Sequence, residues 1–225
     1  TAYEAGLKTE WFDKRVRANV ALFHTIYDDL QLSQFLADSS GSSAVIVNAG
    51  KATFQGVEIE LAAVVTENLT LTASWGYTDP TYDEYLYRNP LTNEVSDVSD
   101  EARFSQVVKS NWHVSAEYLF EPFAFGELGA RVDYAQSSER YMFQLDWETP
   151  FNEEIHDPGH ENLSARISLT ELRFGDTGTW ELGIWGDNLT DQNNVGDGID
   201  FGGLGFAGKY WLEPRRFGVD VKMNL

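Results

Sequence analysis

The sequence predicts an all-β fold, specifically the wall of an antiparallel transmembrane β-barrel. The clearest observation is a strict alternation at the end of the chain, where one strand face is apolar and the other polar. The apolar face carries Phe217, Val219, Val221, Met223 and Leu225. The same two-residue period recurs along the chain, and short and long connections follow one another in turn. Together these features are typical of strands with one face in lipid.

We expect about nine strands, at residues 3–12, 15–34, 46–64, 69–78, 107–120, 127–137, 162–174, 179–189 and 215–225. β-Branched and aromatic residues, which strands favour, are abundant in them. In chain order, the apolar faces of the first seven include Tyr3 and Leu7, Val16 and Val20, Val57 and Ile59, Leu71 and Trp75, Val114 and Tyr118, Val132 and Tyr134, and Ile167 and Leu169. Trp11, Trp75, Tyr77, Trp112, Tyr118 and Trp180 could form the aromatic girdles at the two membrane surfaces, or else pack in a soluble core.

The expected connections alternate in length. Short ones lie at residues 13–14, 66–68, 121–126 and 175–178, and long ones at 35–45, 79–106, 141–161 and 191–214. Short periplasmic turns and long extracellular loops are typical of bacterial outer-membrane barrels. Parity adds an expectation: nine strands place the two chain ends on opposite sides, so this chain would be the C-terminal part of a larger barrel.

Charged residues fix the register of the strands. If the strands slipped by one residue, Arg131, Arg166 and Lys222 would face lipid. Each would cost roughly 2–4 kcal/mol near the bilayer midplane, and together roughly 6–12 kcal/mol. The slip is therefore strongly disfavoured.

Composition excludes several classes of function. The chain has 36 acidic and 16 basic residues, a net charge of −20, and no cysteine. Nucleic-acid binding needs a basic surface, so no nucleic acid is expected as a partner. Disulfides and thiolate metal sites are absent. The acidity indicates a hydrated surface or, alternatively, acidic loops that hold cations.

Four segments resemble the C-terminal half of TonB-dependent outer-membrane receptors. They are residues 3–8 (YEAGLK), 48–60 (NAGKAT followed by QGVEIE), 185–191 (WGDNLTD) and 213–218 (EPRRFG). Gly56 and Gly218 within them permit close approach or bending of a sheet. The last residue departs from the pattern, because such barrels usually end in an aromatic residue and this chain ends in Leu225.

The resemblance implies that residues 1–225 are the C-terminal portion of a probable 22-stranded barrel closed by an N-terminal plug, with plug and early strands absent here. It implies active import of a scarce nutrient, such as a ferric siderophore or an oligosaccharide, across a Gram-negative outer membrane. Energy would come from TonB through the missing N-terminal region, and outer-membrane lipid would surround the wall. No covalent chemistry, cofactor or metal is expected. The rival interpretations are a passive porin and a soluble β-sandwich ligand-binding module.

Aromatic residues in the long loops are the candidate substrate contacts, because flat rings stack on sugars and catechols. They are Tyr82, Tyr85, Tyr141, Trp147, Tyr210 and Trp211. The alternative is that these rings serve loop packing or the outer girdle.

Other motifs carry weaker signals. Gly203, Gly205 and Gly208 lie in a long loop followed by a strand, which does not suit dinucleotide binding. Pro158 and Gly159 separate His156 from His160, so a helical zinc pair is not expected. The acidic stretch of Asp187, Asp191, Asp197 and Asp200 lacks the EF-hand spacing. No serine lies in a nucleophile elbow, so no catalytic residue is assigned.

Overall fold

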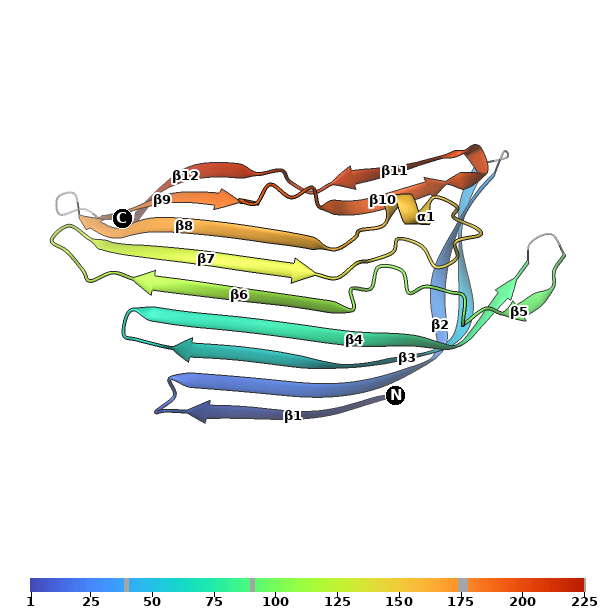
Figure 1. The fold of residues 1–225 in the computed structure, drawn as a ribbon, viewed down its shortest axis with the longest axis horizontal. Coiled ribbons are helices and arrows are strands. Elements are labelled where there is room, and N and C mark those ends of the chain that lie inside the picture. Colours follow the sequence, from blue (N-terminus) through green and yellow to red (C-terminus); the bar gives the residue numbers. More distant parts are fainter. Residues whose placement is uncertain (39–40, 90–91, 174–177, 225) are drawn as a thin grey trace.

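Nine long strands form one antiparallel sheet in the computed structural model, which describes residues 1–38, 41–89, 92–173 and 178–224. The strands are β1 (Ala2–Trp11), β2 (Val16–Asp38), β3 (Gly41–Val64), β4 (Leu69–Arg88), β6 (Ser110–Leu119), β7 (Glu127–Ser137), β8 (His160–Arg173), β9 (Thr179–Asp187) and β12 (Arg216–Asn224). They lie side by side in that order (Figure 1). The predicted all-β antiparallel fold is confirmed, and the sheet is open, with β1 and β12 at its edges.

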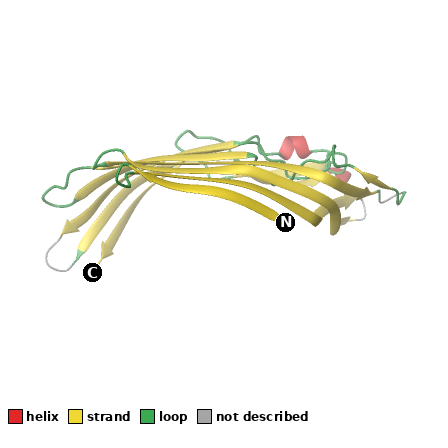
Figure 2. Ribbon diagram, turned by 90° about the horizontal axis from the view of Figure 1, so that it is seen from below, coloured by secondary structure: helices red, strands yellow, loops and turns green. Residues whose placement is uncertain are grey.

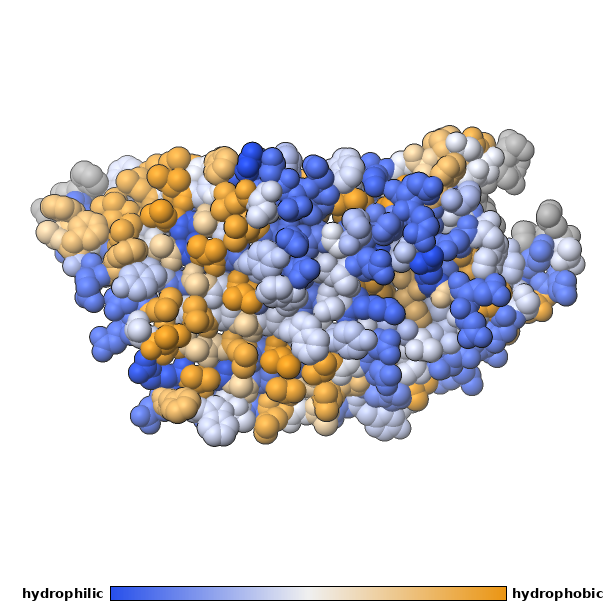
Figure 3. All heavy atoms as spheres, viewed as in Figure 1, coloured by the Kyte–Doolittle hydropathy of each residue, from blue (hydrophilic) through white to orange (hydrophobic). Residues whose placement is uncertain are grey.

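The sheet is a single curved and twisted layer, as Figure 2 shows. Apolar rows run across it on one face. One row crosses six neighbouring strands through Leu71, Ala116, Val132, Ala165, Gly186 and Phe217. The larger side chains of this row are not packed in an interior, since 38% of Leu71, 46% of Val132 and 70% of Phe217 are exposed. Figure 3 shows apolar residues gathered over the strands, and polar residues over the end that carries the long connections.

The opposite face of the sheet is polar and internally paired. Arg166 donates two hydrogen bonds to the two carboxylate oxygens of Asp220, at 2.8 and 2.7 Å. Arg131 likewise contacts Asp133, at 2.7 Å. The predicted register is therefore confirmed at both arginines, which lie away from the apolar face. A dry core between apolar rows, as a soluble β-sandwich requires, is contradicted.

Gly56 lies where the polar face is most crowded. A Cβ atom there would lie 2.0 Å from the carbonyl oxygen of Tyr77 and 2.5 Å from the Phe23 ring. Because backbone cannot move aside as a flexible side chain can, any larger residue would disturb the β3–β4 ladder. Gly218 similarly leaves room for the Trp185 ring.

Short turns occupy one end of the sheet. They join β1 to β2, β3 to β4 and β6 to β7. In the first turn, three consecutive residues have positive φ: Phe12, Asp13 and Lys14. This left-handed backbone conformation lets the chain reverse direction within a short turn. Two predictions fall largely outside the described part of the chain. They are the short turn at 175–178, because residues 174–177 are not described, and the unusual last residue of the chain, residue 225. The chain starts at the opposite end of the sheet (Figure 1).

The expected long loops contain more regular structure than the sequence suggests. The predicted loop at 35–45 is wrong, because β2 continues to Asp38 and β3 starts at Gly41. Within 79–106, β4 continues to Arg88 and pairs with the short β5 (Val95–Asp97). The other two contain α1 (Asn152–Ile155) and the β10 (Val195–Phe201), η1 (Gly202–Leu204) and β11 (Phe206–Trp211) hairpin. Among the described residues, no helix is long and apolar enough to cross a membrane.

Two irregularities in the strands explain why the alternation of apolar and polar residues does not predict the extended parts of β2, β3 and β4. Opposite β4, Lys51 pairs with Glu84 and Ala52 with Tyr82, so Asp83 is an extra bulged residue. The bulge breaks the two-residue period. In β2, Asp29 has a φ of 55°, and the ladder to β3 shifts on either side of Leu30. Beyond this bend the β2–β3 hairpin turns across the end of the sheet toward β10 and η1 (Figure 1).

Apart from Leu172, the buried apolar residues of the described chain cluster at the long-connection end. The larger cluster contains Ala52, Tyr82, Tyr85, Val98 and Leu145, with Leu30, Leu32 and Phe104 packed around it. A smaller one contains Met142, Ile155 and Val195. We call this end, comprising the extensions of β2–β4 and residues 89–109, 138–159 and 188–215, the mouth. The nine paired strand segments below it are the wall.

Candidate functional site

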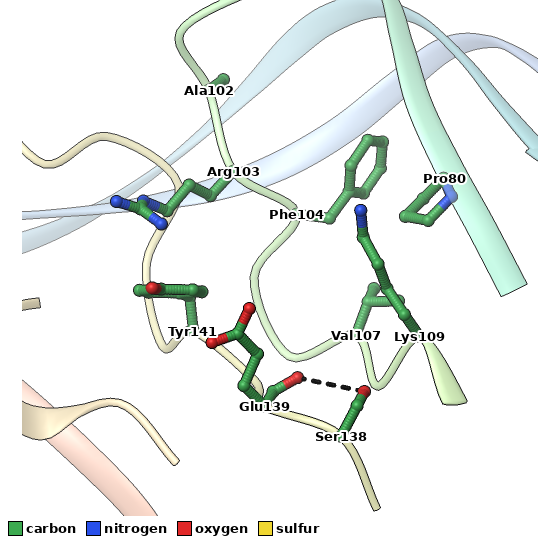
Figure 4. A pocket seen from close by; sticks show the side chains of 9 residues that line it. All are labelled: Pro80, Ala102, Arg103, Phe104, Val107, Lys109, Ser138, Glu139 and Tyr141. Atoms are coloured by element: carbon green, nitrogen blue, oxygen red, sulfur yellow. Dashed lines mark hydrogen bonds between the residues drawn. The ribbon is translucent and has the colours of Figure 1, made fainter. Parts of the chain in front are cut away.

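A cavity of about 350 Å³ lies where the mouth meets the wall. Its lining comes from β4, from the segment before β6 and from the segment after β7: Pro80, Ala102, Arg103, Phe104, Val107, Lys109, Ser138, Glu139 and Tyr141 (Figure 4). Pro80 lies two residues after Thr78, and Lys109 two residues before Asn111. By strand alternation both belong to the polar face. The cavity therefore opens on the side away from the apolar rows.

Tyr141 is held between two other side chains. The Arg103 guanidinium carbon lies 4.0 Å from the centre of one face of the ring. The His156 imidazole is stacked on the ring, with centroids 5.1 Å apart and planes 15° from parallel. Burial raises the pKa of the Tyr141 hydroxyl, which stays protonated and donates to Glu153 at 3.3 Å. These contacts make Tyr141 a fixed wall of the cavity.

Arg103 is neutralised by its neighbours. Its guanidinium group lies 2.9 Å from the Asp146 carboxylate and 2.6 Å from the Glu153 carboxylate. Two acids thus surround one cation, and Arg103 joins the segment before β6 to the segment after β7. Its role is to hold the cavity together rather than to present free charge.

Tyr82 and Tyr85 do not lie in an exposed loop, contrary to expectation. They lie on β4, with only 6% of Tyr82 and none of Tyr85 exposed. Their rings are 5.1 Å apart, and Tyr82 stacks on Phe104 with centroids 3.8 Å apart. The Asp97 carboxylate accepts hydrogen bonds from the backbone N–H groups of Tyr85 and Ser99, which hold the pKa of Asp97 below its ordinary value. Packing, the alternative considered for loop aromatics, accounts for both tyrosines.

The other three aromatic candidates are exposed but separate. Trp147 is 47% exposed and contacts the Tyr87 ring edge-on, with centroids 5.9 Å apart. Tyr210 and Trp211 lie on β11, at 60% and 54% exposure, and Lys209 lies over the Trp211 ring. No ring contact within the described residues joins Tyr141, Trp147 and β11. Their contact with ligand stays a prediction.

Ser137, His160 and Asp157 meet at the top of β7. The Ser137 hydroxyl lies 3.1 Å and the Asp157 carboxylate 3.2 Å from the same atom, Nδ1 of His160. A catalytic triad needs serine and acid on opposite ring nitrogens. This cluster therefore cannot relay a proton to the serine, and it ties the fully buried Asp157 to β8.

The remaining candidate groups are spread among structural contacts. Asp187 pairs with Arg216 and Asp191 with Arg215, while the buried Asp200 accepts from the Phe151 backbone N–H. No group of potential metal ligands is found within the described residues. Gly203 lies on η1, Gly208 on β11 and Gly205 between the two, which is not a strand-to-helix phosphate loop.

Reasoning from the sequence missed the charged residues of the cavity. Arg103, Lys109 and Glu139 are not among the residues that the sequence predicts, because the prediction for the long connections rests on aromatic residues alone. One signal was available: Lys109 is the only lysine between Lys51 and Lys209 in a strongly acidic chain.

A family model for the β-barrel of TonB-dependent receptor-like proteins matches residues 1–189. The chain belongs to the TonB-dependent receptor family. Proteins of this family lie in the outer membrane of Gram-negative bacteria, so the apolar rows of the wall face lipid.

Relatives of this TonB-dependent receptor chain are longer than it is. The ferric-pyoverdine M114 receptor PbuA of Pseudomonas sp. (strain M114) is 28% identical over 233 residues, covering 99% of this chain and 24% of the relative. The chain thus spans about a quarter of that receptor's length.

Solved receptor structures show the same fold. The siderophore receptor PiuA of Acinetobacter baumannii superposes with a TM-score of 0.66 and 15% identity, covering 98% of this chain and 27% of that one. The ferric yersiniabactin uptake receptor FyuA of Yersinia pestis gives 0.69 and 18%, covering 98% and 29%. These similarities concern the architecture of the wall and mouth.

Proposed function

We propose that residues 1–225 form part of the wall and mouth of a receptor that binds a scarce nutrient, such as a ferric siderophore, and imports it with energy delivered through TonB. The observation that carries the proposal is the cavity at the mouth, on the polar face of a wall whose other face is in lipid. A ligand arriving from outside the cell reaches this cavity before it reaches the lumen. The names of the relatives support an iron chelate as cargo.

In this proposal the sheet is the C-terminal portion of a larger closed barrel. The open edges at β1 and β12 and the length of the relatives support that interpretation. The plug and the segment that contacts TonB belong to the rest of the receptor. Residues 1–225 contribute the lipid seal, part of the polar lumen and the ligand-facing mouth.

The packing of the mouth favours a receptor over a passive porin. A porin needs an open aqueous channel, whereas here the connections pack on two buried clusters and on the bent β2–β3 hairpin. The arrangement of Ser137, His160 and Asp157 supports a non-enzymatic role, because its geometry cannot activate a nucleophile.

Transport by the full-length receptor tests the proposal. Cells that produce it as their only iron-chelate receptor are given ⁵⁵Fe-labelled catecholate, hydroxamate and pyoverdine chelates, in strains with and without TonB. We expect one chelate class to be accumulated only when TonB is present, while binding to the cell surface persists without it. Uptake that is independent of TonB would support a porin, and binding of labelled oligosaccharides alone would replace iron with sugar as the cargo.

A further inference from the structure

The cavity contains two charged groups of opposite sign that nothing in the described structure neutralises. The Lys109 ammonium has no hydrogen bond or ion pair with any described residue, although the chain as a whole carries a net charge of −20. The Glu139 carboxylate also has none within the same residues; only its backbone oxygen accepts, from the Ser138 hydroxyl. Both line the cavity, and both are exposed to whatever enters it.

The two groups do not neutralise each other. No ion pair links Lys109 to Glu139 among the described residues, although both line one cavity. In Figure 4 the lysine ammonium lies beside Phe104 and Pro80, and the Glu139 carboxylate lies toward Tyr141, on another side of the cavity. Arg103, the other cation, is already occupied by Asp146 and Glu153. The cavity therefore presents one positive and one negative group at separate positions.

Two fixed aromatic rings lie beside these charges, Phe104 next to Lys109 and Tyr141 next to Glu139 (Figure 4). Phe104 is fixed by stacking on the buried Tyr82, and Tyr141 is fixed between Arg103 and His156. Phe104 is already ordered, so a planar group that packs against it loses little conformational entropy there, whereas Tyr141, covered by Arg103 and His156, is a fixed wall of the cavity. A planar group packed against Phe104 would lie next to Lys109, with Glu139 on another side of the cavity (Figure 4).

We propose that this cavity binds a flat molecule or molecular segment of mixed charge. A carboxylate or similar anionic group lies at Lys109, an ammonium or similar donor lies at Glu139, and the planar part lies against Phe104. The proposal deepens the proposed function, on which it rests for its biological meaning, by naming the ligand chemistry that the mouth selects. Acidic surroundings attract the cationic part, and Lys109 supplies the one local site for the anionic part.

Four small aromatic probes separate the two charged contacts. 4-(Aminomethyl)benzoate carries the two charges at opposite ends of its ring, 4-methylbenzoate carries only the negative one, 4-methylbenzylamine only the positive one, and 4-methylbenzyl alcohol neither. Their binding to the detergent-solubilised full-length receptor is measured by saturation-transfer NMR and titration. We expect 4-(aminomethyl)benzoate to bind most tightly and the alcohol most weakly, with each charged contact changing affinity by roughly tenfold.

The variants Lys109→Gln and Glu139→Gln assign each contact. The first should weaken binding of 4-(aminomethyl)benzoate and 4-methylbenzoate but leave 4-methylbenzylamine unchanged, and the second should do the reverse for the two probes with single charges. Lys51→Gln and Glu94→Gln, exposed residues outside the cavity, are matched controls that should change nothing. Equal binding of all four probes, no binding of any, or loss of all four in one variant would overturn the proposal. Uptake of an iron chelate in cells is a separate measurement, so failure here leaves the proposed function standing.

Discussion

The wall and the mouth of this molecule are stabilised in different ways. In the wall, every second side chain faces outward, and many of these stay exposed in the protein itself, as for Val132 at 46% and Ile184 at 63%. In the mouth, side chains from three connections meet in a conventional buried cluster, where Tyr85 is fully buried and Leu145 is 2% exposed. One region depends on lipid and on backbone ladders, and the other on side-chain packing.

This difference predicts which property of the receptor a substitution in each region should change. A change in the mouth should disturb ligand contact and leave the ladder intact, because local opening is limited by local packing. A change on the lipid-facing rows should disturb insertion into the membrane and leave the cavity geometry intact. The two regions can therefore be perturbed separately in the full-length receptor.

Tyr85→Ala should have the largest effect. Removing a fully buried aromatic ring costs about 3–5 kcal/mol, and here the loss falls on the mouth alone. Hydrogen–deuterium exchange should become faster across residues 95–107 and stay unchanged across β7. Tyr210→Ala, at a ring that is 60% exposed, is the control and should alter neither region. Equal acceleration in β7 would show that the mouth and wall unfold together.

Val132→Arg should have the next largest effect. The new cation would face the lipid from the middle of β7, at a cost of roughly 2–4 kcal/mol. Urea unfolding of the receptor in lipid bilayers measures the change. Ser164→Arg places the same side chain on the polar face opposite Asp133 and should cost far less. If both arginines cost the same, the assignment of the two faces is wrong.

Glu148→Gln should have the smallest effect, and its sign depends on pH. Burial raises the pKa of Glu148, and a hydrogen bond with the Tyr87 hydroxyl partly opposes the shift. Because the folded-state pKa lies above the unfolded-state value, the mouth is most stable below the ordinary carboxyl pKa. It loses stability as the pH rises through the raised pKa.

The glutamine variant should remove this decline, so that stability of the mouth no longer falls between acidic and neutral pH. Fluorescence of the neighbouring Trp147, which contacts Tyr87, reports local unfolding in urea at each pH. Glu101→Gln, at an exposed position, provides the comparison. A decline that persists unchanged in Glu148→Gln would assign the pH dependence to other groups.

The wall could be predicted from the sequence because its physics is periodic. Lipid on one face and water on the other impose a two-residue repeat, and Arg131 and Arg166 exclude the slipped register. The mouth could not be predicted in the same way. Tyr82 and Tyr85 are three residues apart, so in a regular strand they would point to opposite faces. The bulge at Asp83 places them in one cluster, and no local sequence pattern predicts such a bulge.

The cavity illustrates a second limit. Lys109 and Glu139 are thirty residues apart in the sequence, and only the pairing of β6 with β7 brings them to one site. Whether these two side chains have ion-pair partners depends on the folded structure and cannot be predicted from the sequence. Composition gives a hint, a single lysine in a long acidic stretch, but not the geometry.

The bend at Asp29 has a mechanical consequence. In sheet order, β2 lies next to one edge, while β10 and η1 belong to the connection that leads to β12 at the other edge. The bent β2–β3 hairpin nonetheless contacts both β10 and η1. The hairpin therefore links two parts of the chain that belong to opposite sides of the curved sheet. Moving the two edges of the sheet apart would have to break the contacts of β2 with β10 and η1, so these contacts help to hold the curvature of the wall.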